Sequence, residues 1–117
     1  MVRDPARLST KARNLLSDRG MQIAVPAAAA WELAIKLSKG KFPDAAPIVA
    51  DYPAVLLRLG ASSLAHTHTH MLHAGQMEWD HRDPFDRLIA ASAICEGIPL
   101  VTADAAFGAA PGLQRLW

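Results

Sequence analysis

The sequence predicts an α/β fold with a parallel sheet, and three observations support this prediction. Extended and helical patterns alternate along the 117 residues. The run 98–102 is short, apolar and flanked by turn signals, which is typical of a strand buried in a parallel sheet. The segment 83–96 begins with Asp-Pro and ends before Gly97, which is typical of a capped helix. Alternation of this kind favours strands joined by helical crossovers.

The first half of the chain is expected to hold three helices and one strand. Asp4 and Pro5 form a helix start, because Asp caps the first turn and Pro fits its first position, and Gly20 ends that helix. Three prolines leave the start of the third helix open. The predicted order is a helix over 4–20, a strand over 21–25, a helix over 27–39 and a helix within 44–60.

The second half of the chain is less regular until residue 83. The segment 63–69 is ambiguous, and 70–77 is either a short helix or a turn. The helix over 83–96 has the clearest signal, because apolar residues recur almost all around it between its two end signals. The strand over 98–102 follows, and 113–117 is a candidate last strand.

Composition indicates a globular, soluble protein of one domain over residues 1–117. Hydrophobic residues make up 51% of the chain and charged residues 20%, and the formal net charge is +1. A nucleic-acid binder held by bulk charge would be more basic, so any anion site must be local. Cys95 is the single cysteine, which excludes an intrachain disulfide. With no long apolar run and no apolar leader at the start, a cytoplasmic protein without membrane contact is expected.

Widely separated acids in this apolar chain indicate one shared metal site. Glu32 follows the first predicted strand, Asp104 follows the strand over 98–102, and Asp86 opens the helix between them with Asp83. Ligands bind beyond the carboxyl ends of parallel strands, where two of these acids are expected. Clustered carboxylates repel one another unless a cation neutralises them or one of them takes up a proton. Oxygen ligands of this kind favour Mg²⁺ or Mn²⁺.

Each acid also has a structural alternative that the sequence leaves open. Asp83 can be the N-cap of the following helix, with Asp86 as the third helical residue, where a carboxylate suits the helix dipole. Asp104 can cap a short helix over 105–107. Glu32 can pair with Lys36 one turn later, in the favourable Glu-to-Lys order.

The histidines and arginines add two further hypotheses. If residues 66–70 are extended, His66, His68 and His70 share one face and, with His73, form a candidate zinc or nickel site; the alternative is a solvated strand end.

Arg82 and Arg87 flank the acids and are candidates for holding RNA phosphates, or else for ion pairs with neighbouring aspartates. Trp31, Trp79 and Trp117 are expected to be core or interface anchors rather than platforms for bases.

The chain resembles PIN-domain ribonucleases of the VapC type, the toxin half of bacterial type II toxin–antitoxin pairs. The resemblance covers nearly every residue, and the run His-Arg-Asp-Pro-Phe-Asp-Arg at 81–87 is its most specific part. The matching runs are 4–9, 30–36 (Ala-Trp-Glu-Leu-Ala-Ile-Lys) with Gly40-Lys41, 70–75, 81–91, 100–107 (Leu-Val-Thr-Ala-Asp-Ala-Ala-Phe) and Leu116-Trp117. The resemblance implies a three-layer α/β/α fold.

The resemblance also implies an activity and a site. Glu32, Asp86 and Asp104 correspond to acids of the family's metal site, Asp83 matches an acid of this subgroup, and Thr102 would orient the Asp104 region or a bound water. The implied activity is Mg²⁺-dependent endonucleolytic cleavage of RNA. The implied partners are a cognate antitoxin protein and a second copy of the chain.

The sequence departs from this family at its start. Family members begin with a central strand that ends in Leu-Asp-Thr-His or a similar run and carries the first metal-binding Asp. Here Asp4 and Pro5 match the later start of the first helix, and Asp18 falls in the turn that follows it. We therefore expect the central first strand and one ligand to be missing. An inactive or truncated PIN-like protein that keeps antitoxin-binding or dimer contacts is the alternative function.

Overall fold

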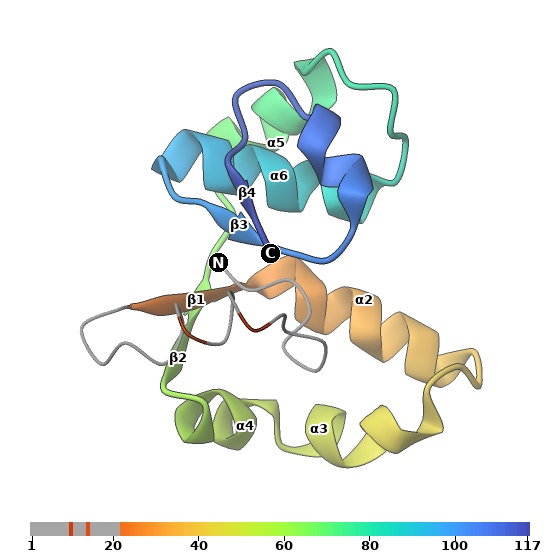
Figure 1. Cartoon of the computed structure of the whole chain (residues 1–117). Coiled ribbons are helices and arrows are strands. Elements are labelled where there is room, and N and C mark those ends of the chain that lie inside the picture. Colours follow the sequence, from red (N-terminus) through yellow and green to blue (C-terminus); the bar gives the residue numbers. More distant parts are fainter. Residues whose placement is uncertain (1–9, 11–13, 15–21) are drawn as a thin grey trace.

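The computed structural model describes residues 10, 14 and 22–117, so most of the predicted helix over 4–20 and the start of the strand at Met21 lie outside it. Figure 1 shows its elements in two groups. None of the helices in the described segments has the length and apolarity needed to cross a membrane. The first group comprises β1 (Ile23–Pro26), α2 (Ala27–Ser38), η2 (Pro43–Ala45), α3 (Ala46–Ala50), α4 (Tyr52–Arg58) and β2 (Ala61–Leu64). The second comprises α5 (His68–Gln76), α6 (Pro84–Glu96), β3 (Leu100–Val101), η3 (Ala105–Ala109) and β4 (Arg115–Leu116).

The strands of the described residues pair in parallel, as the sequence predicts. β1 pairs with β2, with Ile23 opposite Ala61, and β3 pairs with β4, with Leu100 opposite Arg115. Within residues 22–117 these are two separate two-stranded sheets. Ile23 nevertheless packs with the buried Val101 of β3, so the two groups share apolar contacts. The absence of the family's central first strand stays a prediction.

The helix expected within 44–60 is three shorter elements, η2, α3 and α4. The break falls at Asp51, whose φ of −141° and ψ of 59° are not helical. Pro53 explains the restart, because a helix continuing through it would lose one backbone hydrogen bond and push the proline ring against the preceding turn. By contrast, α2 and α6 begin and end within two residues of their predicted limits.

Histidines 68 and 70 lie in helix α5, so the prediction that His66, His68 and His70 share one face of a strand is wrong. Thr67 starts this helix with a reciprocal pair of hydrogen bonds. The His70 N–H donates to Thr67 Oγ1 at 3.3 Å, and the Thr67 N–H donates to His70 Nδ1 at 3.1 Å. Glu or Gln is the usual third residue of such a capping box, so the histidine concealed the helix start.

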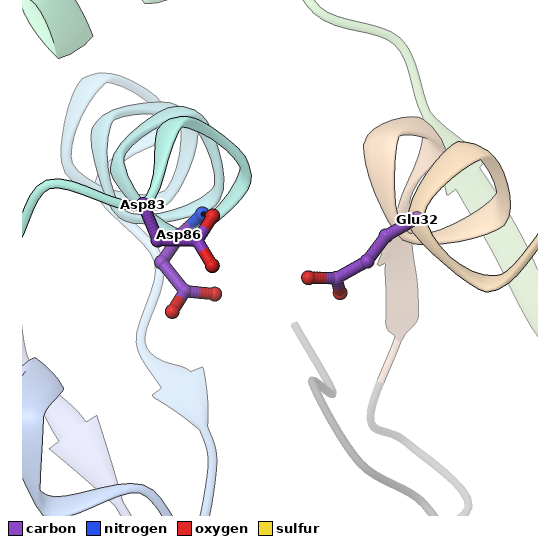
Figure 2. A group of neighbouring side chains, drawn as sticks. All are labelled: Glu32, Asp83 and Asp86. Carbon is purple, nitrogen blue, oxygen red and sulfur yellow. Dashed lines mark hydrogen bonds between the residues drawn. The ribbon is translucent and has the colours of Figure 1, made fainter. Parts of the chain in front are cut away.

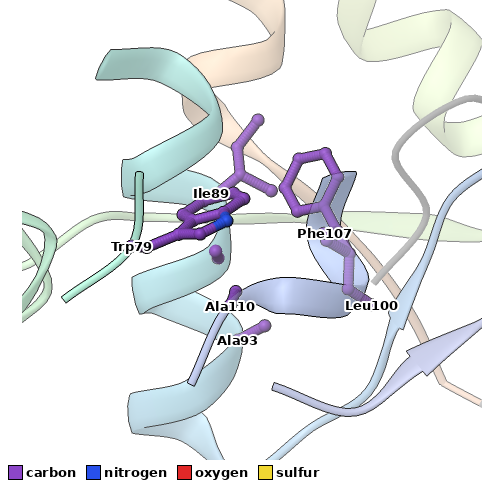
Figure 3. Packing of buried hydrophobic residues seen from close by; sticks show 7 residues of the cluster. Trp79, Ile89, Ala93, Leu100, Phe107 and Ala110 are labelled. Atoms are coloured by element: carbon purple, nitrogen blue, oxygen red, sulfur yellow. The ribbon is translucent and has the colours of Figure 1, made fainter. Parts of the chain in front are cut away.

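The main apolar core lies between α6 and the segments on either side of it (Figure 3). The Trp79 and Phe107 rings are 5.5 Å apart between centroids, and both side chains are buried. The prediction of a core anchor is therefore confirmed for Trp79, whereas Trp31 is 64% exposed. The other buried members are Ile89, Ala90, Ala93, Leu100 and Ala110. This packing fixes α6, whose N-terminal turn carries two of the candidate acids.

Candidate metal centre

The first turn of α6 carries Asp83 and Asp86. Asp83 is the N-cap, and its Oδ1 accepts the N–H groups of Phe85 at 2.9 Å and Asp86 at 3.3 Å. Pro84 occupies the first helical position, where its missing N–H costs nothing. The structural role expected of Asp83 is therefore present, and such a cap contributes about 1 kcal/mol. The Asp86 carboxylate, one turn on, is buried at 6% exposure.

Helix α2 carries the third acid. Glu32 is 7% exposed, and Ala28, one turn earlier, is the other buried residue of this helix. The Lys36 ammonium lies 3.8 Å from Glu32 Oε2, so the pairing considered from sequence is present. Lys36 neutralises part of the charge of a carboxylate that would otherwise be costly to bury.

Glu32, Asp83 and Asp86 form one group of carboxylates. Figure 2 shows Glu32 extending from α2 toward the two aspartates of α6. One carboxylate oxygen from each residue lies within 4.8 Å of the others. Ligands on opposite sides of a Mg²⁺ ion are about 4.2 Å apart, at about 2.1 Å from the metal. Neighbouring ligands of an octahedral ion are only about 3.0 Å apart, so the three carboxylates would have to draw closer to share one ion. Hard oxygen ligands of this kind fit a divalent cation such as Mg²⁺ or Mn²⁺.

His81 contacts this group, a relationship that the sequence analysis missed. Its Nε2 lies 2.7 Å from Asp86 Oδ2, and its ring stacks near Trp79 at 4.8 Å between centroids. The contact spans the non-helical approach to α6, where no regular spacing predicts which side chains meet. The only signal in the sequence was the place of His81 at the head of the 81–87 run.

Asp104 is outside the group that the described carboxylates form. Its Oδ1 accepts the Ala106 N–H at 2.9 Å and caps η3, which is the structural alternative considered for it. Asp104 is exposed, whereas Thr102 is buried at 1% exposure. The Asp104 N–H donates to Thr102 Oγ1 at 3.2 Å, so Thr102 fixes the backbone at Asp104. In place of Asp104, the structure brings Asp83 to Glu32 and Asp86.

The two arginines of the 81–87 run have different surroundings. Arg82 is exposed. Among the described residues, no ion pair joins Arg87 to a neighbouring aspartate. Its guanidinium instead donates to backbone carbonyl oxygens at the end of α5 and in the segment that joins α5 to α6. These acceptors are Ala74 at 2.9 Å, Met77 at 2.6 Å, Trp79 at 2.6 Å and His81 at 3.0 Å. Arg87 therefore shapes the approach to Asp83.

The structure does not bring the histidines together as metal ligands. All five histidines lie in the described segments, where the one group of three or more potential ligand side chains is the acidic one. His70 is buried and its Nε2 lies 2.8 Å from Glu96 Oε1, so it serves the packing of α5 on α6. His66 is held by two hydrogen bonds from other elements.

Comparisons with known proteins agree with this architecture. The profile of the PIN domain matches residues 2–113. The fold is similar to that in the crystal structure of VapBC2 from Rickettsia felis, bound to a DNA fragment from their promoter, with a TM-score of 0.69 and 22% identity. That similarity covers 92% of this chain and 85% of the other. A search of curated protein sequences gives no significant match.

Proposed function

Because this chain belongs to the PIN-domain family, whose members are generally nucleases, we propose that it is a divalent-metal-dependent endoribonuclease of the VapC type. The observation that carries the proposal is the meeting of Glu32 with Asp83 and Asp86 across two helices. Each acid alone has a structural role, but capping and ion pairing do not require two buried carboxylates to face one another. The VapBC2 relative supports a toxin that works with an antitoxin.

We assign the ligand roles by burial. Glu32 and Asp86 are buried and would hold the ion directly, while Asp83 is exposed and has one oxygen engaged in its cap. When bound, Mg²⁺ or Mn²⁺ would acidify a water molecule and stabilise the charge that develops on the phosphodiester. His81 would hold the Asp86 carboxylate in one orientation, which limits the freedom lost when an ion binds.

We retain Asp104 in the proposed site, although it lies outside the group formed by Glu32, Asp83 and Asp86. It follows β3, and ligands of open parallel sheets bind beyond the carboxyl ends of the strands. Mg²⁺ retains several water molecules in most protein sites, so an acid can act on a bound water without touching the ion. Thr102, through its bond to the Asp104 N–H, would fix the position of that acid.

Arg82 is the residue that we propose for RNA binding. It is exposed and directly precedes Asp83, so its guanidinium is available to a phosphate near the acids. Arg87 was the second candidate, but its four bonds to carbonyl oxygens leave it a supporting role. This distinction makes separate predictions for the two arginines. The formal net charge of +1 also favours a local phosphate contact over binding by a broad basic surface.

An antitoxin would reach the site over α2. Trp31 is 64% exposed and Phe42 is 59% exposed, beside the Glu32–Lys36 pair. The Trp31 ring meets Phe85 edge-on at 4.9 Å, directly before Asp86. An apolar antitoxin segment placed on Trp31 and Phe42 would bury these rings and block access to the acids.

A second copy of the chain is the other protein partner in this proposal. Helix α5 exposes Met71 and Leu72, which are 55% and 60% exposed, on the element that packs along α6. Two adjacent large apolar side chains on one helix give a self-complementary contact if α5 meets its own copy. We expect cytoplasmic RNA to be the substrate of this dimer.

The proposal is tested by RNA cleavage in the presence of Mg²⁺ or Mn²⁺, with the Asp86→Ala variant as control. We expect the wild-type protein to cut RNA internally, EDTA to stop it, and the variant to lose activity. Equal cleavage by both proteins would assign the activity to a contaminant. No cleavage, together with a stable complex with an antitoxin, would instead support the inactive PIN-like alternative.

A further inference from the structure

His66, between β2 and α5, connects the two helices that carry the acids, and the proposed mechanism does not use it. Its Nε2 accepts the backbone N–H of Ala28 in α2 at 2.9 Å. Its Nδ1 lies 2.7 Å from the hydroxyl of Ser92 in α6. The imidazole therefore joins elements that are far apart in the sequence.

The hydrogen bond from the Ala28 N–H to His66 provides an acceptor for the first turn of α2 that the N-cap residue does not supply. The first N–H groups of a helix have no partner within the helix. Pro26 is the N-cap of α2 and makes no side-chain capping bond, since proline has no polar side chain. His66 supplies the missing acceptor from another element. An acceptor supplied in this way fixes where α2 begins relative to the rest of the fold.

The hydrogen bonds also define which form of His66 fits. The Ala28 N–H can only donate, so Nε2 must carry a lone pair and Nδ1 must carry the proton. Nδ1 then donates to Ser92 Oγ, whose own hydrogen is donated to the Leu88 carbonyl at 2.7 Å. Burial, and in second place the nearby His70, lower the pKa of His66, in agreement with a neutral ring.

The residue of α2 that His66 contacts lies on the same face of the helix as Glu32. Ala28 and Glu32 are one turn apart on the buried face of α2. Farther along the same interface, Trp31 contacts Phe85, and Glu32 meets Asp86. At one end of this interface Ala28 is linked to Ser92 through His66, and at the other end Glu32 lies near Asp86. A shift of α2 at Ala28 would therefore move Glu32 relative to Asp86.

We propose that His66 is a positioning residue that holds α2 against α6 at the spacing at which Glu32 and Asp86 can share one divalent ion. The functional part of this proposal rests on the proposed nuclease site, while the spacing itself does not. A second proton, on Nε2, would remove the acceptor and set two N–H groups against each other. Among the described residues, the titratable neighbour facing His66 is His70, which lies 6.2 Å away between ring centroids and is paired with Glu96. The hydrogen-bond partners of His66 on α2 and α6 are uncharged.

The spacing is measured on the full chain without metal. One spin label is placed on Ser38→Cys, at the exposed end of α2, and the other on the native Cys95 of α6. Pulsed electron paramagnetic resonance then measures the distance between the two helices. We expect one narrow distance distribution at pH 8 and a broader one at an acidic pH, because burial lowers the pKa of His66 and moves its protonation to the acidic side of the ordinary histidine range. In this background, His66→Gln keeps an acceptor for Ala28 and should give a narrow distribution at both pH values.

His66→Leu removes both bonds while keeping an apolar side chain of similar size. It should give a broad distribution at pH 8 and bind Mn²⁺ about 10 to 100 times more weakly, whereas His66→Gln should stay within about threefold of wild type. The same substitution at exposed His68 of α5 is the matched control and should change neither measurement. If His66→Leu does not fold, Ser92→Ala removes the anchor on α6 and should broaden the distribution.

A narrow, pH-independent distribution in the wild type, or an unchanged distance and Mn²⁺ affinity in His66→Leu, would overturn the role of His66. If the wild-type protein binds no Mn²⁺ at all, the nuclease proposal fails, and the metal-free distances still decide whether His66 sets the helix spacing.

Discussion

His81 Nε2 and Asp86 Oδ2 lie 2.7 Å apart, and the His81 ring packs beside Trp79 of the buried core. The core therefore fixes the histidine, and the histidine fixes one oxygen of a candidate ligand. Orientation of this kind matters because outer contacts of metal ligands influence affinity nearly as much as some ligands do.

His81→Phe should weaken Mn²⁺ binding by about 10 to 100-fold, because the ring packing remains but the bond to Asp86 is lost. Isothermal titration calorimetry measures the affinity, and thermal unfolding without metal checks the fold. His68→Phe, on the exposed surface of α5, is the control and should bind Mn²⁺ as the wild type does. An unchanged affinity in His81→Phe would show that Asp86 needs no outer partner.

Asp83 combines capping with a ligand role, and two substitutions separate them. Asp83→Asn keeps an acceptor for the N–H groups of Phe85 and Asp86 but removes the charge. It should leave the free energy of unfolding within about 0.5 kcal/mol and weaken Mn²⁺ binding, whereas Asp83→Ala should also destabilise the fold by about 1 kcal/mol. Urea unfolding and calorimetry provide the two readouts. Equal metal affinity in all three proteins would leave Asp83 with capping alone.

Arg87→Lys should destabilise the protein by about 2 to 4 kcal/mol, because a single ammonium cannot reach carbonyl oxygens that four guanidinium contacts now satisfy. Urea unfolding measures the change. Arg82→Lys, at an exposed position, should stay within about 0.5 kcal/mol of wild type.

Arg82→Ala should weaken RNA binding without changing stability, measured by fluorescence anisotropy with a labelled oligonucleotide and Ca²⁺ in place of Mg²⁺. If instead Arg82→Ala binds RNA normally, the proposed phosphate contact is wrong.

Asp104→Ser distinguishes a site residue from a helix cap. Serine caps nearly as well as aspartate, so the bond to the Ala106 N–H and the stability should be kept. We expect RNA cleavage to fall at least about 10-fold, because the carboxylate that would act on a metal-bound water is gone. Cleavage at the wild-type rate would restrict Asp104 to capping η3 and leave the site to the acids of α2 and α6.

Local signals predicted those parts of the fold that neighbouring residues determine. The cap at Asp83, the limits of α2 and α6, and the Glu32–Lys36 pair all depend on residues within a turn or two of one another. The parallel direction of the strands also followed from their alternation with helices. The prolines between residues 43 and 53 left only the start of this helix open, and the break at Asp51 was not predicted.

The sequence patterns did not predict contacts between segments that are far apart along the chain. The carboxylate group contains Asp83, where the sequence analysis expected Asp104. This difference depends on how α6 lies against α2, which the spacing of residues along the sequence does not determine. His66 received a metal-binding hypothesis, whereas its actual partners, Ala28 and Ser92, come from two other helices. Arg87 likewise satisfies carbonyl oxygens of an irregular segment.

The central claim is that Glu32 and Asp86 hold one divalent ion between α2 and α6, and Mn²⁺ titration of the wild type, Glu32→Gln and Asp86→Asn tests it most directly. We expect one site in the wild type and an affinity loss of more than about 100-fold in each variant. At about 100 times the dissociation constant, Mn²⁺ should stabilise only the wild type, by about 2.7 kcal/mol. Equal binding by all three proteins, or no binding by the wild type, would contradict the claim.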